Sequence, residues 1–312
     1  MKMKAELQLT SQDRFRGALL GLACGDAVGT TVEFESRGTF VPSTDMVGGD
    51  PFGLRQGEWT DDTSMALCLA ASLIEQQGFD PHDQLTRYCR WRNHGYMSST
   101  GRCFDIGNTT SAALGRFERL GTPYCSDEVD SHMSAANGCL MRLAPVPMWF
   151  YPDCGKTIHF AGLSARTTHG ALECLDATKL FGAILHAALS GACKDELLFE
   201  TASTVSITSN AVKALPKGSY AEETVIQIHG SFFVVDALEA ALWCFLNTDS
   251  FEAAILAAAN LGDDADTTAA ICGQVAGAYY GESGIPDHWL QHLFMAEEIR
   301  ALADGLRLHH AI

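Results

Sequence analysis

The chain has 312 residues, of which 47% are hydrophobic and 19% charged, and this composition predicts a large packed core with little disorder. Its formal net charge of −17 argues against nucleic acid or an anionic membrane surface as a partner, because Lys and Arg are the residues that meet phosphates. No apolar run approaches the ~20 residues that span a bilayer. Neither nucleic-acid binding nor membrane insertion is therefore expected.

Eleven cysteines are present, an odd number without a CxxC pair, and several lie in apolar helical segments. Such cysteines are typical of reduced, buried thiols in a cytosolic protein. The first residues show no apolar segment of the secretory signal type. We therefore expect a cytoplasmic protein and no cysteine zinc site.

Helical spacing of apolar residues recurs along nearly the whole chain, and frequent Gly and Ala favour helices that pack closely through small residues. Asp80 is expected to cap a helix with Pro81 in its first turn, and residues 39–57 form a loop. The pattern predicts one all-α domain over residues 1–312. The predicted helices span 10–24, 60–77, 80–93, 108–120, a segment ended by Pro145 and Pro147, 171–190, 194–206, 232–246, 250–260, 266–280 and 286–307.

Two acidic motifs each precede a helix of small residues: "EWTDDTSM" at 58–65 and "LGDDADTT" at 261–268. Capping is the ordinary explanation of an acidic helix start, because Thr and Asp cap helices and acids favour the positive end of the helix dipole. Capping does not readily explain carboxylates side by side, since like charges repel. The first motif has Asp61 and Asp62, and the second has Asp263, Asp264 and Asp266.

A shared cation is the alternative explanation of the two motifs. Side chains at a helix start fan out around its open end, so two such starts can converge on one point and form a cage of oxygens. Mg²⁺ and Mn²⁺ prefer oxygen ligands, and neither motif contains His or Cys for zinc. Shared carboxylates suit two ions about 3.5–4 Å apart. Composition and spacing alone leave both hypotheses open: helix caps or a two-metal site.

A series of segments resembles the ADP-ribosylglycohydrolase family, of the dinitrogenase-reductase-activating type. The resemblance covers nearly the whole chain, in order. It implies a compact orthogonal helical bundle, a binuclear Mg²⁺ or Mn²⁺ centre, and removal of ADP-ribose from modified protein side chains. The segments are "RFRGALLGLACGDAVGTTVEF", "EWTDDTSMAL", "GRCFDIGNTTSAAL", "ANGCLMRLAPV", "SARTTH", "VVDALEAALWCF" and "ANLGDDADTTAAICGQVAGAYYG".

The resemblance also implies roles for single residues. Asn137 and Gly138 are expected beside the pyrophosphate, His169 as a hydrogen bonder to the substrate, and Phe232 as a stacking surface where arginine-specific relatives carry Tyr. Asp263 occupies a position where the family often has Gly, and we interpret it as a residue behind the ligands or a helix cap. The implied metal ligands are Thr60, Asp61, Asp62, Asp264, Asp266 and Thr267.

The implied reaction breaks the N-glycosidic bond between ADP-ribose and arginine, and two carboxylates are candidates to assist it. Asp105 is the candidate acid/base, because guanidine is a poor leaving group that needs a proton. Glu33 is the second carboxylate, as a base or a gate. A loop salt bridge is the plain alternative for either residue.

The implied partner is an ADP-ribosylated protein, and the product is ADP-ribose. Hydrolysis of serine ADP-ribose or O-acetyl-ADP-ribose is an alternative activity. A toxin-immunity protein that combines occlusion with removal of ADP-ribose is another.

Overall fold

The computed structural model describes residues 9–125 and 134–309 of the chain. Helices make up the fold, and the described residues form no strand beyond isolated bridges between Gly49 and Leu54 and between Ala136 and Phe233. The predicted all-α fold class is confirmed. The helices are α1 (Ser11–Gly29), α2 (Asp61–Glu75), α3 (Pro81–His94), α4 (Asn108–Leu120), α5 (Pro145–Phe150), α6 (Cys154–Arg166), α7 (Leu172–Ser190), α8 (Val234–Leu246), α9 (Phe251–Ala259), α10 (Ala265–Tyr280), α11 (Asp287–His292) and α12 (Ala296–Leu308).

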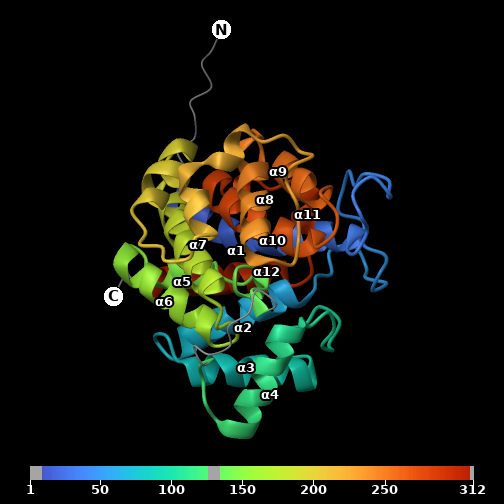
Figure 1. Ribbon diagram of the computed structural model, residues 1–312. Helices are drawn as coiled ribbons and strands as arrows, with labels where there is room; N and C mark the ends of the chain where they lie inside the picture. Colours follow the sequence, from blue (N-terminus) through green and yellow to red (C-terminus); the bar gives the residue numbers. More distant parts are fainter. Residues whose placement is uncertain (1–8, 126–133, 310–312) are drawn as a thin grey trace.

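Helices α1 and α10 lie in the middle of the molecule, with the other helices packed around them (Figure 1). They run antiparallel and touch through backbone. A Cβ added at each of four glycines of α1 would lie only 2.2–2.4 Å from a carbonyl oxygen of α10, so larger residues do not fit. The C-terminal end of α1 therefore lies against the N-terminal end of α10. The four positions, which we call the glycine stripe, are Gly17, Gly21, Gly25 and Gly29.

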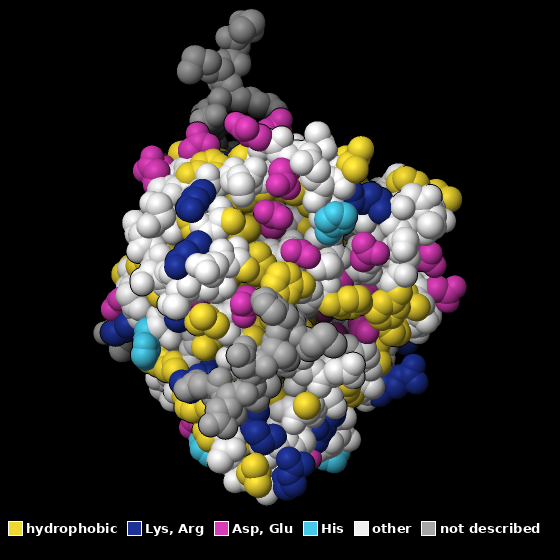
Figure 2. Space-filling model, in the orientation of Figure 1, with side chains coloured by type: hydrophobic (Ala, Val, Ile, Leu, Met, Phe, Trp, Pro, Cys, Tyr) yellow, Lys and Arg dark blue, Asp and Glu magenta, His cyan; other side chains and the backbone are white. Residues whose placement is uncertain are grey.

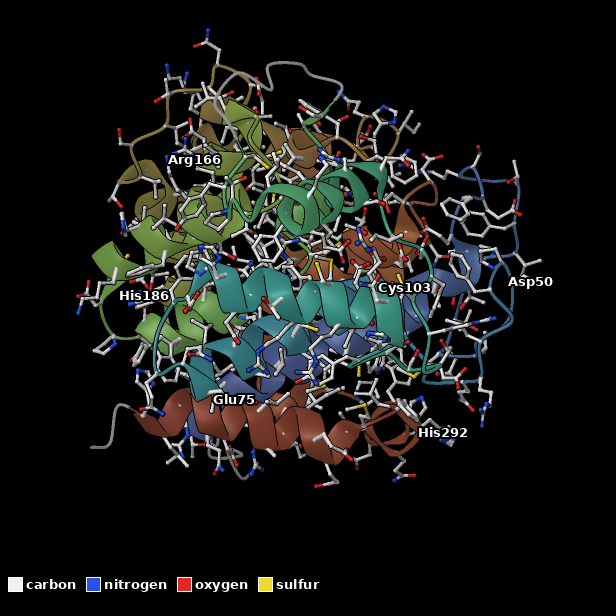
Figure 3. All side chains as sticks on the ribbon, turned by 90° about the horizontal axis from the view of Figure 1, so that it is seen from below. Asp50, Glu75, Cys103, Arg166, His186 and His292 are labelled. Atoms are coloured by element: carbon white, nitrogen blue, oxygen red, sulfur yellow. The ribbon has the colours of Figure 1, made fainter. Side chains whose placement is uncertain are left out.

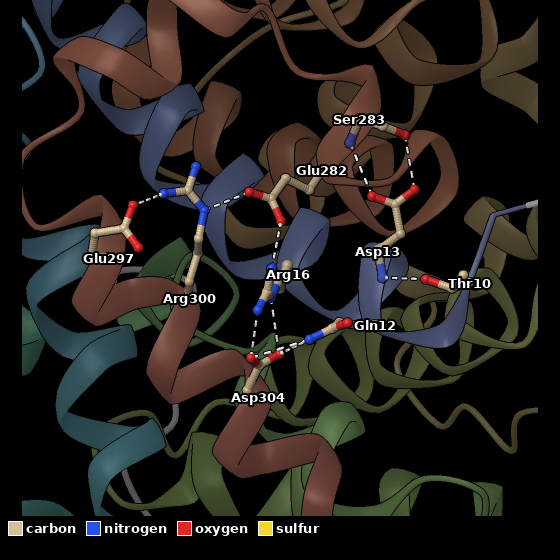
Figure 4. A network of polar contacts seen from close by, with 9 residues as sticks. All are labelled: Thr10, Gln12, Asp13, Arg16, Glu282, Ser283, Glu297, Arg300 and Asp304. Carbon is tan, nitrogen blue, oxygen red and sulfur yellow. Dashed lines mark hydrogen bonds and ion pairs between the residues drawn. The ribbon is translucent and has the colours of Figure 1, made fainter.

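The far end of this helix pair is held by a polar network at the surface (Figure 4). Arg16 of α1 donates to Asp304 of α12, with Nη2 2.6 Å from Oδ2. Asp13 accepts a hydrogen bond from the Ser283 hydroxyl at 2.8 Å, just after α10. Each of these pairs at or near the surface contributes little alone, but the network ties α12 and the segment after α10 to the start of α1.

Most predicted helices form near their expected bounds, and the cap of Asp80 on α3 is confirmed. The first helix runs on to Gly29 instead of ending at residue 24, because Gly25 and Gly29 continue the contact with α10. The helix predicted to end at Pro145 and Pro147 is wrong. Pro145 instead stands in the first turn of α5, where the missing N–H has no cost.

Three further segments differ from expectation. Helix α6 was not predicted, although Asp153 caps it by accepting from the Lys156 N–H. Residues 194–203 are helical with a wider turn at Glu196–Thr201, and the helix predicted over 194–206 is shorter. The helix predicted over 286–307 is broken into α11 and α12 at Met295, whose φ is +56°.

The break between α11 and α12 is anchored by the loop that leads to the first acidic motif. Phe294 N–H donates to the Gly57 carbonyl at 3.0 Å, and the Trp59 indole donates to the Phe294 carbonyl at 3.2 Å. Seen from below, His292 and the loop carrying Asp50 lie on the same side of the molecule, opposite His186 (Figure 3). The C-terminal helices thus brace the entrance to α2.

Helices α3 and α4 project at the lower end of the molecule (Figure 1), and a small hydrophobic cluster joins them to Met65 and Cys68 of α2 and to Met141. Lys and Arg side chains gather at this end on the face shown in Figure 2, whereas Asp and Glu predominate above it. Among the described residues of α3, α4 and the loop between them, the exposed arginines are Arg90, Arg102 and Arg119. The loop that joins α3 to α4 brings Asp105 to the cavity that Asp61 and Asp264 also line. Within the described ranges, no helix is both long and apolar enough to cross a membrane.

Candidate metal centre and active site

The two acidic motifs meet at the Thr60 hydroxyl. Its oxygen lies 3.1 Å from Oδ2 of Asp62 in its own motif and 3.2 Å from Oδ2 of Asp266 in the other. Oδ1 of Asp26, from α1, lies 2.9 Å away. A hydroxyl carries one hydrogen, so it can satisfy only one of these three carboxylate oxygens. The site therefore concentrates more negative oxygen than its own hydrogens can compensate.

Asp26 is a site residue that sequence reasoning missed. It is fully buried in α1, and its carboxylate accepts from the backbone N–H groups of Thr60 and Thr63 at 2.9 and 3.0 Å. The two threonine hydroxyls lie 2.9 and 2.6 Å from the same carboxylate. Asp26 thus caps α2 from another helix, while Thr60 makes no side-chain cap of its own. The signal was an acid within the apolar stretch "ACGDAVG".

Further carboxylates surround this contact. Single oxygens of Glu33, Asp264 and Asp266 lie within 4.8 Å of one another, and all three side chains are buried. Asp61 and Asp62 are buried beside them at the start of α2. Burial, followed by the charge of Asp266, raises the pKa of the other four carboxyls well above the usual range.

This donor set fits hard divalent cations. Both motifs offer only carboxylate and hydroxyl oxygens, which Mg²⁺ and Mn²⁺ prefer. Oδ1 of Asp62 is buried and has no hydrogen-bond partner among the described residues. A buried oxygen without a partner is costly, and ligation would satisfy it. Helix capping, the first hypothesis from the sequence, does not account for this oxygen, and neither Thr60 nor Asp264 makes a side-chain capping hydrogen bond.

Glu33 is held in the site by the second motif. The Asp266 N–H donates to Oε2 of Glu33 at 3.1 Å. The N–H of the next residue, Phe34, donates to the Asp263 carbonyl at 2.8 Å. The Asp263 N–H in turn donates to the backbone carbonyl of Glu35, also at 2.8 Å. Phe34 and Asp263 have φ values of +65° and +57°, uncommon for residues other than glycine. Asp263 therefore fixes the Glu33 loop through its backbone.

Asp105 reaches the site from the α3–α4 loop, with a φ of +59°. Burial, followed by the charges of Asp266 and Asp61, raises the pKa of Asp105 to about 11. In the absence of a cation this carboxyl therefore holds its proton at neutral pH. A strained conformation and a raised pKa together are typical of a functional carboxyl.

A cavity of about 620 Å³ opens over these groups. Thr60 and Asp62 do not line this cavity: the Thr60 hydroxyl contacts Asp266, which does, and Asp62 contacts Thr60. The predicted residues lining the cavity are Glu33, Asp61, Asp105, Asn137, Gly138, His169, Phe232, Asp264, Asp266 and Thr267. All predicted site residues thus lie in or directly behind one cavity, and their roles stay predictions.

Asn137 is bound more closely to the second motif than to the open cavity. Its side-chain amide donates to Oδ2 of Asp264, and its backbone N–H donates to the Phe232 carbonyl at 3.1 Å. Gly138 follows it in the wall, where an added Cβ would lie 3.2 Å from Cε1 of His169. Asn137 therefore orients a predicted ligand, and Gly138 keeps space beside the imidazole.

Aromatic rings form one rim of the cavity. Phe34 and Phe232 are 54% and 56% exposed, and their ring centroids lie 6.5 Å apart in a stacked arrangement. Phe52 contacts Phe34 at 6.1 Å and Phe104 at 5.2 Å. Phe232 was expected to offer a stacking surface. Phe34, Phe52 and Phe104 were not predicted as site residues. They lie in separate irregular segments, and contacts between such segments leave no periodic pattern in the sequence.

A family model described as ADP-ribosylglycohydrolase matches residues 7–312. The chain belongs to the ADP-ribosylglycohydrolase family. The ADP-ribosylarginine hydrolase Tri1 of Pseudomonas putida (strain GB-1) is 44% identical over 294 residues, which cover 94% of this chain and 78% of that protein. The ADP-ribosyl-[dinitrogen reductase] glycohydrolase of Rhodospirillum rubrum is 32% identical over 307 residues, which cover 94% of this chain and 95% of that protein.

The fold agrees with this ADP-ribosylglycohydrolase membership. A solved structure titled "ADP-ribosylglycohydrolase-related protein complex" superposes with a TM-score of 0.83 at 42% identity, covering 95% of this chain and 98% of that chain. The family predicted from the motifs is confirmed. Its dinitrogenase-reductase-activating type is not singled out, because the Rhodospirillum enzyme is less similar than the Pseudomonas arginine hydrolase.

Proposed function

We propose that this ADP-ribosylglycohydrolase hydrolyses the N-glycosidic bond between ADP-ribose and an arginine side chain of a protein, with two Mg²⁺ or Mn²⁺ ions as cofactors. The observation that carries the proposal is the convergence of both Asp/Thr motifs, buried, at the base of a cavity that Asp105 also lines. The name of the Pseudomonas relative, an ADP-ribosylarginine hydrolase, supports arginine as the modified residue.

The ligands of the proposed ions come from both helix starts. When bound, the ions would supply positive charge that orders the hydroxyls of the distal ribose and a water molecule. Asp26 holds Thr60 from behind the cavity, and Asn137 holds Asp264 from the cavity wall. The proposed ligands are Thr60, Asp61, Asp62, Asp264, Asp266 and Thr267.

Two carboxyls of the chain move protons in the proposed reaction. Asp105 donates its proton to the guanidine nitrogen as the bond from C1 of the ribose to that nitrogen breaks. Water adds its oxygen to C1 and gives a proton to a carboxylate, Asp105 or Glu33. The products are free arginine on the protein and ADP-ribose, so atoms and charge balance.

The rest of the cavity suits the substrate. Gly138 and His169 lie together in one wall and Phe232 at the rim, where the pyrophosphate and a planar group respectively could bind. The protein partner is an arginine-ADP-ribosylated protein. The eleven thiols are free in the structure, which supports a cytoplasmic location.

Release of ADP-ribose from a defined arginine conjugate tests this function, with serine ADP-ribose and O-acetyl-ADP-ribose as competing substrates. We expect activity on arginine that a chelator abolishes. Asp264→Asn should lower the rate on the order of 10²-fold or more, because several kcal/mol of charge stabilisation is lost. The neighbouring Asp263→Asn is the matched control and should stay near wild type. A preference for serine, or full activity of Asp264→Asn with chelator, refutes the proposal.

A further inference from the structure

Arg142 is a buried cation without an acidic partner. Its side chain is fully buried, and no carboxylate of the described residues pairs with it. Nη2 donates to the Thr168 hydroxyl at 2.6 Å and lies 3.4 Å from the Ser164 carbonyl, and the guanidinium lies over the Tyr88 ring at 4.8 Å. An uncompensated buried charge is costly, so a second role is expected for it.

Thr168 connects this cation to His169. Its hydroxyl oxygen lies 2.7 Å from Nδ1 of His169, and its one further side-chain partner among the described residues is Arg142. A guanidinium only donates, so the Thr168 oxygen must accept from Arg142. The Thr168 hydrogen then has one acceptor within reach, Nδ1 of His169. If Nδ1 carried a hydrogen instead, the hydroxyl hydrogen would be buried without an acceptor.

The other nitrogen of His169, Nε2, lies toward Gly138, 3.4 Å from a Cβ added there, and both residues line the cavity. Nε2 is buried, has no partner among the described residues, and belongs to a cavity-lining side chain only 1% exposed. Gly138 leaves the ring open, because any side chain there would press on Cε1. Burial, then the charge of Arg142, lowers the pKa of His169 to about 3, so the ring is neutral at physiological pH.

We propose that Arg142 and Thr168 are positioning residues that lock His169 in its neutral Nε2–H tautomer, so that it donates a hydrogen bond to a pyrophosphate oxygen of ADP-ribose. This inference rests on the proposed function for the identity of the ligand. A phosphate oxygen only accepts, which matches a ring that can only donate into the cavity. The unpaired charge of Arg142 also offsets the many carboxylates that would repel an anion. His169 then cannot serve as a base.

The tautomer is read directly from long-range ¹H–¹⁵N spectra of the ¹⁵N-labelled full chain at pH 7, with the His169 signals assigned by their absence in His169→Gln. We expect a protonated Nε2 and an unprotonated Nδ1. A ring protonated at Nδ1, or at both nitrogens, overturns the proposal. This measurement needs no substrate and no variant of Arg142 or Thr168, so it stands even if the arginine hydrolase activity fails.

Binding of ADP-ribose, measured by calorimetry, tests the consequence. Thr168→Val keeps the shape but removes the hydroxyl, and should raise Kd about tenfold or more, as for loss of a hydrogen bond to a charged group. In the NMR spectra, Thr168→Val should also no longer show His169 protonated at Nε2 alone. Thr168→Ser should restore both. Thr157→Val removes a buried hydroxyl of α6 that has no partner in the described part of the chain, and this matched control should bind like wild type.

ADP carries the pyrophosphate without the distal ribose. Its binding therefore tests whether His169 contacts the pyrophosphate, independently of which tautomer the ring adopts. Its Kd should rise by the same factor in Thr168→Val. An unchanged Kd for ADP overturns the assignment to the pyrophosphate, and an unchanged Kd for both ligands overturns the positioning role. If ADP-ribose binds with these differences while no arginine conjugate is hydrolysed, the proposed function fails and this inference holds.

Discussion

At the scale of single residues, Asp26 shows how a buried carboxylate can build a site without lining it. Asp26→Asn replaces one acceptor oxygen by an NH₂ group facing donors on Thr60 or Thr63. We expect Mg²⁺ affinity to fall about 10- to 100-fold, since residues that orient ligands have effects of this size. Calorimetric titration with Mg²⁺ measures it. Asp13→Asn, at the exposed start of the same helix, should bind Mg²⁺ as wild type does, and equal affinity in Asp26→Asn would contradict the expectation.

Asp105 allows proton transfer and metal binding to be separated. Asp105→Asn cannot donate or accept the proton, so kcat should fall about 10²- to 10⁴-fold. Mg²⁺ affinity should change little, because Asp105 is not among the proposed ligands. The pair of measurements is steady-state kinetics and Mg²⁺ titration. A variant that loses Mg²⁺ binding in step with kcat would make Asp105 a ligand instead.

Without the family resemblance, site residues were predictable only where the sequence itself repeats a chemical pattern. Asp61 and Asp62, and Asp264 and Asp266, could be singled out because adjacent acids at two helix starts need an explanation. Asp26 could not, because its partners lie 34 and 37 positions away and an acid inside an apolar helix has many possible fates. The site roles themselves stay predictions.

At the scale of elements, the glycine stripe makes the packing of α1 on α10 intolerant of one methyl group. A Cβ at Gly21 would lie 2.3 Å from the Gly273 carbonyl oxygen, and backbone cannot move aside like a flexible side chain. Gly21→Ala should therefore destabilise the protein by about 3 kcal/mol or more. Gly115→Ala on α4, where nothing lies within 4 Å, should instead stabilise by up to about 1 kcal/mol. Urea unfolding distinguishes them, and equal stabilities would contradict this account.

Helix positions followed the apolar period, whereas helix ends followed tertiary contacts. From the sequence, Pro145 can equally end one helix or stand in the first turn of the next, and only the surrounding tertiary structure decides between these positions. The break at Met295 depends on Gly57 and Trp59, which lie far away in the sequence. Local pattern contains no information about such partners. The close helix contact expected from Gly and Ala was confirmed, but not which helices make it.

At the scale of the whole molecule, the clustered carboxyls couple stability to pH and to divalent ions. Their pKa values in the folded, metal-free protein are raised above the unfolded values near 4. Stability from such groups is fully present below pH 4 and is lost as pH rises toward the folded pKa. We therefore expect the Tm of metal-free protein to fall between about pH 5 and pH 8.

Mg²⁺ should cancel this loss, because it binds the ionised form. Saturation at 100 times Kd adds about 2.7 kcal/mol to the free energy of unfolding. Thermal melts across pH, with Mg²⁺ or with NaCl of equal ionic strength, test the pair of expectations. If Tm changes with neither pH nor Mg²⁺, or if NaCl raises Tm as much as Mg²⁺ does, the carboxyls do not form a cation site.

The glycine stripe also has a consequence for experiments that measure how well each position tolerates every single substitution. Positions 17, 21, 25 and 29 should reject nearly every replacement, at a spacing of four that resembles a motif. None of them lines the cavity. Intolerance there would report how closely two backbones approach, and a search for active-site residues that ranks positions by intolerance alone would select them beside Asp61 and Asp264.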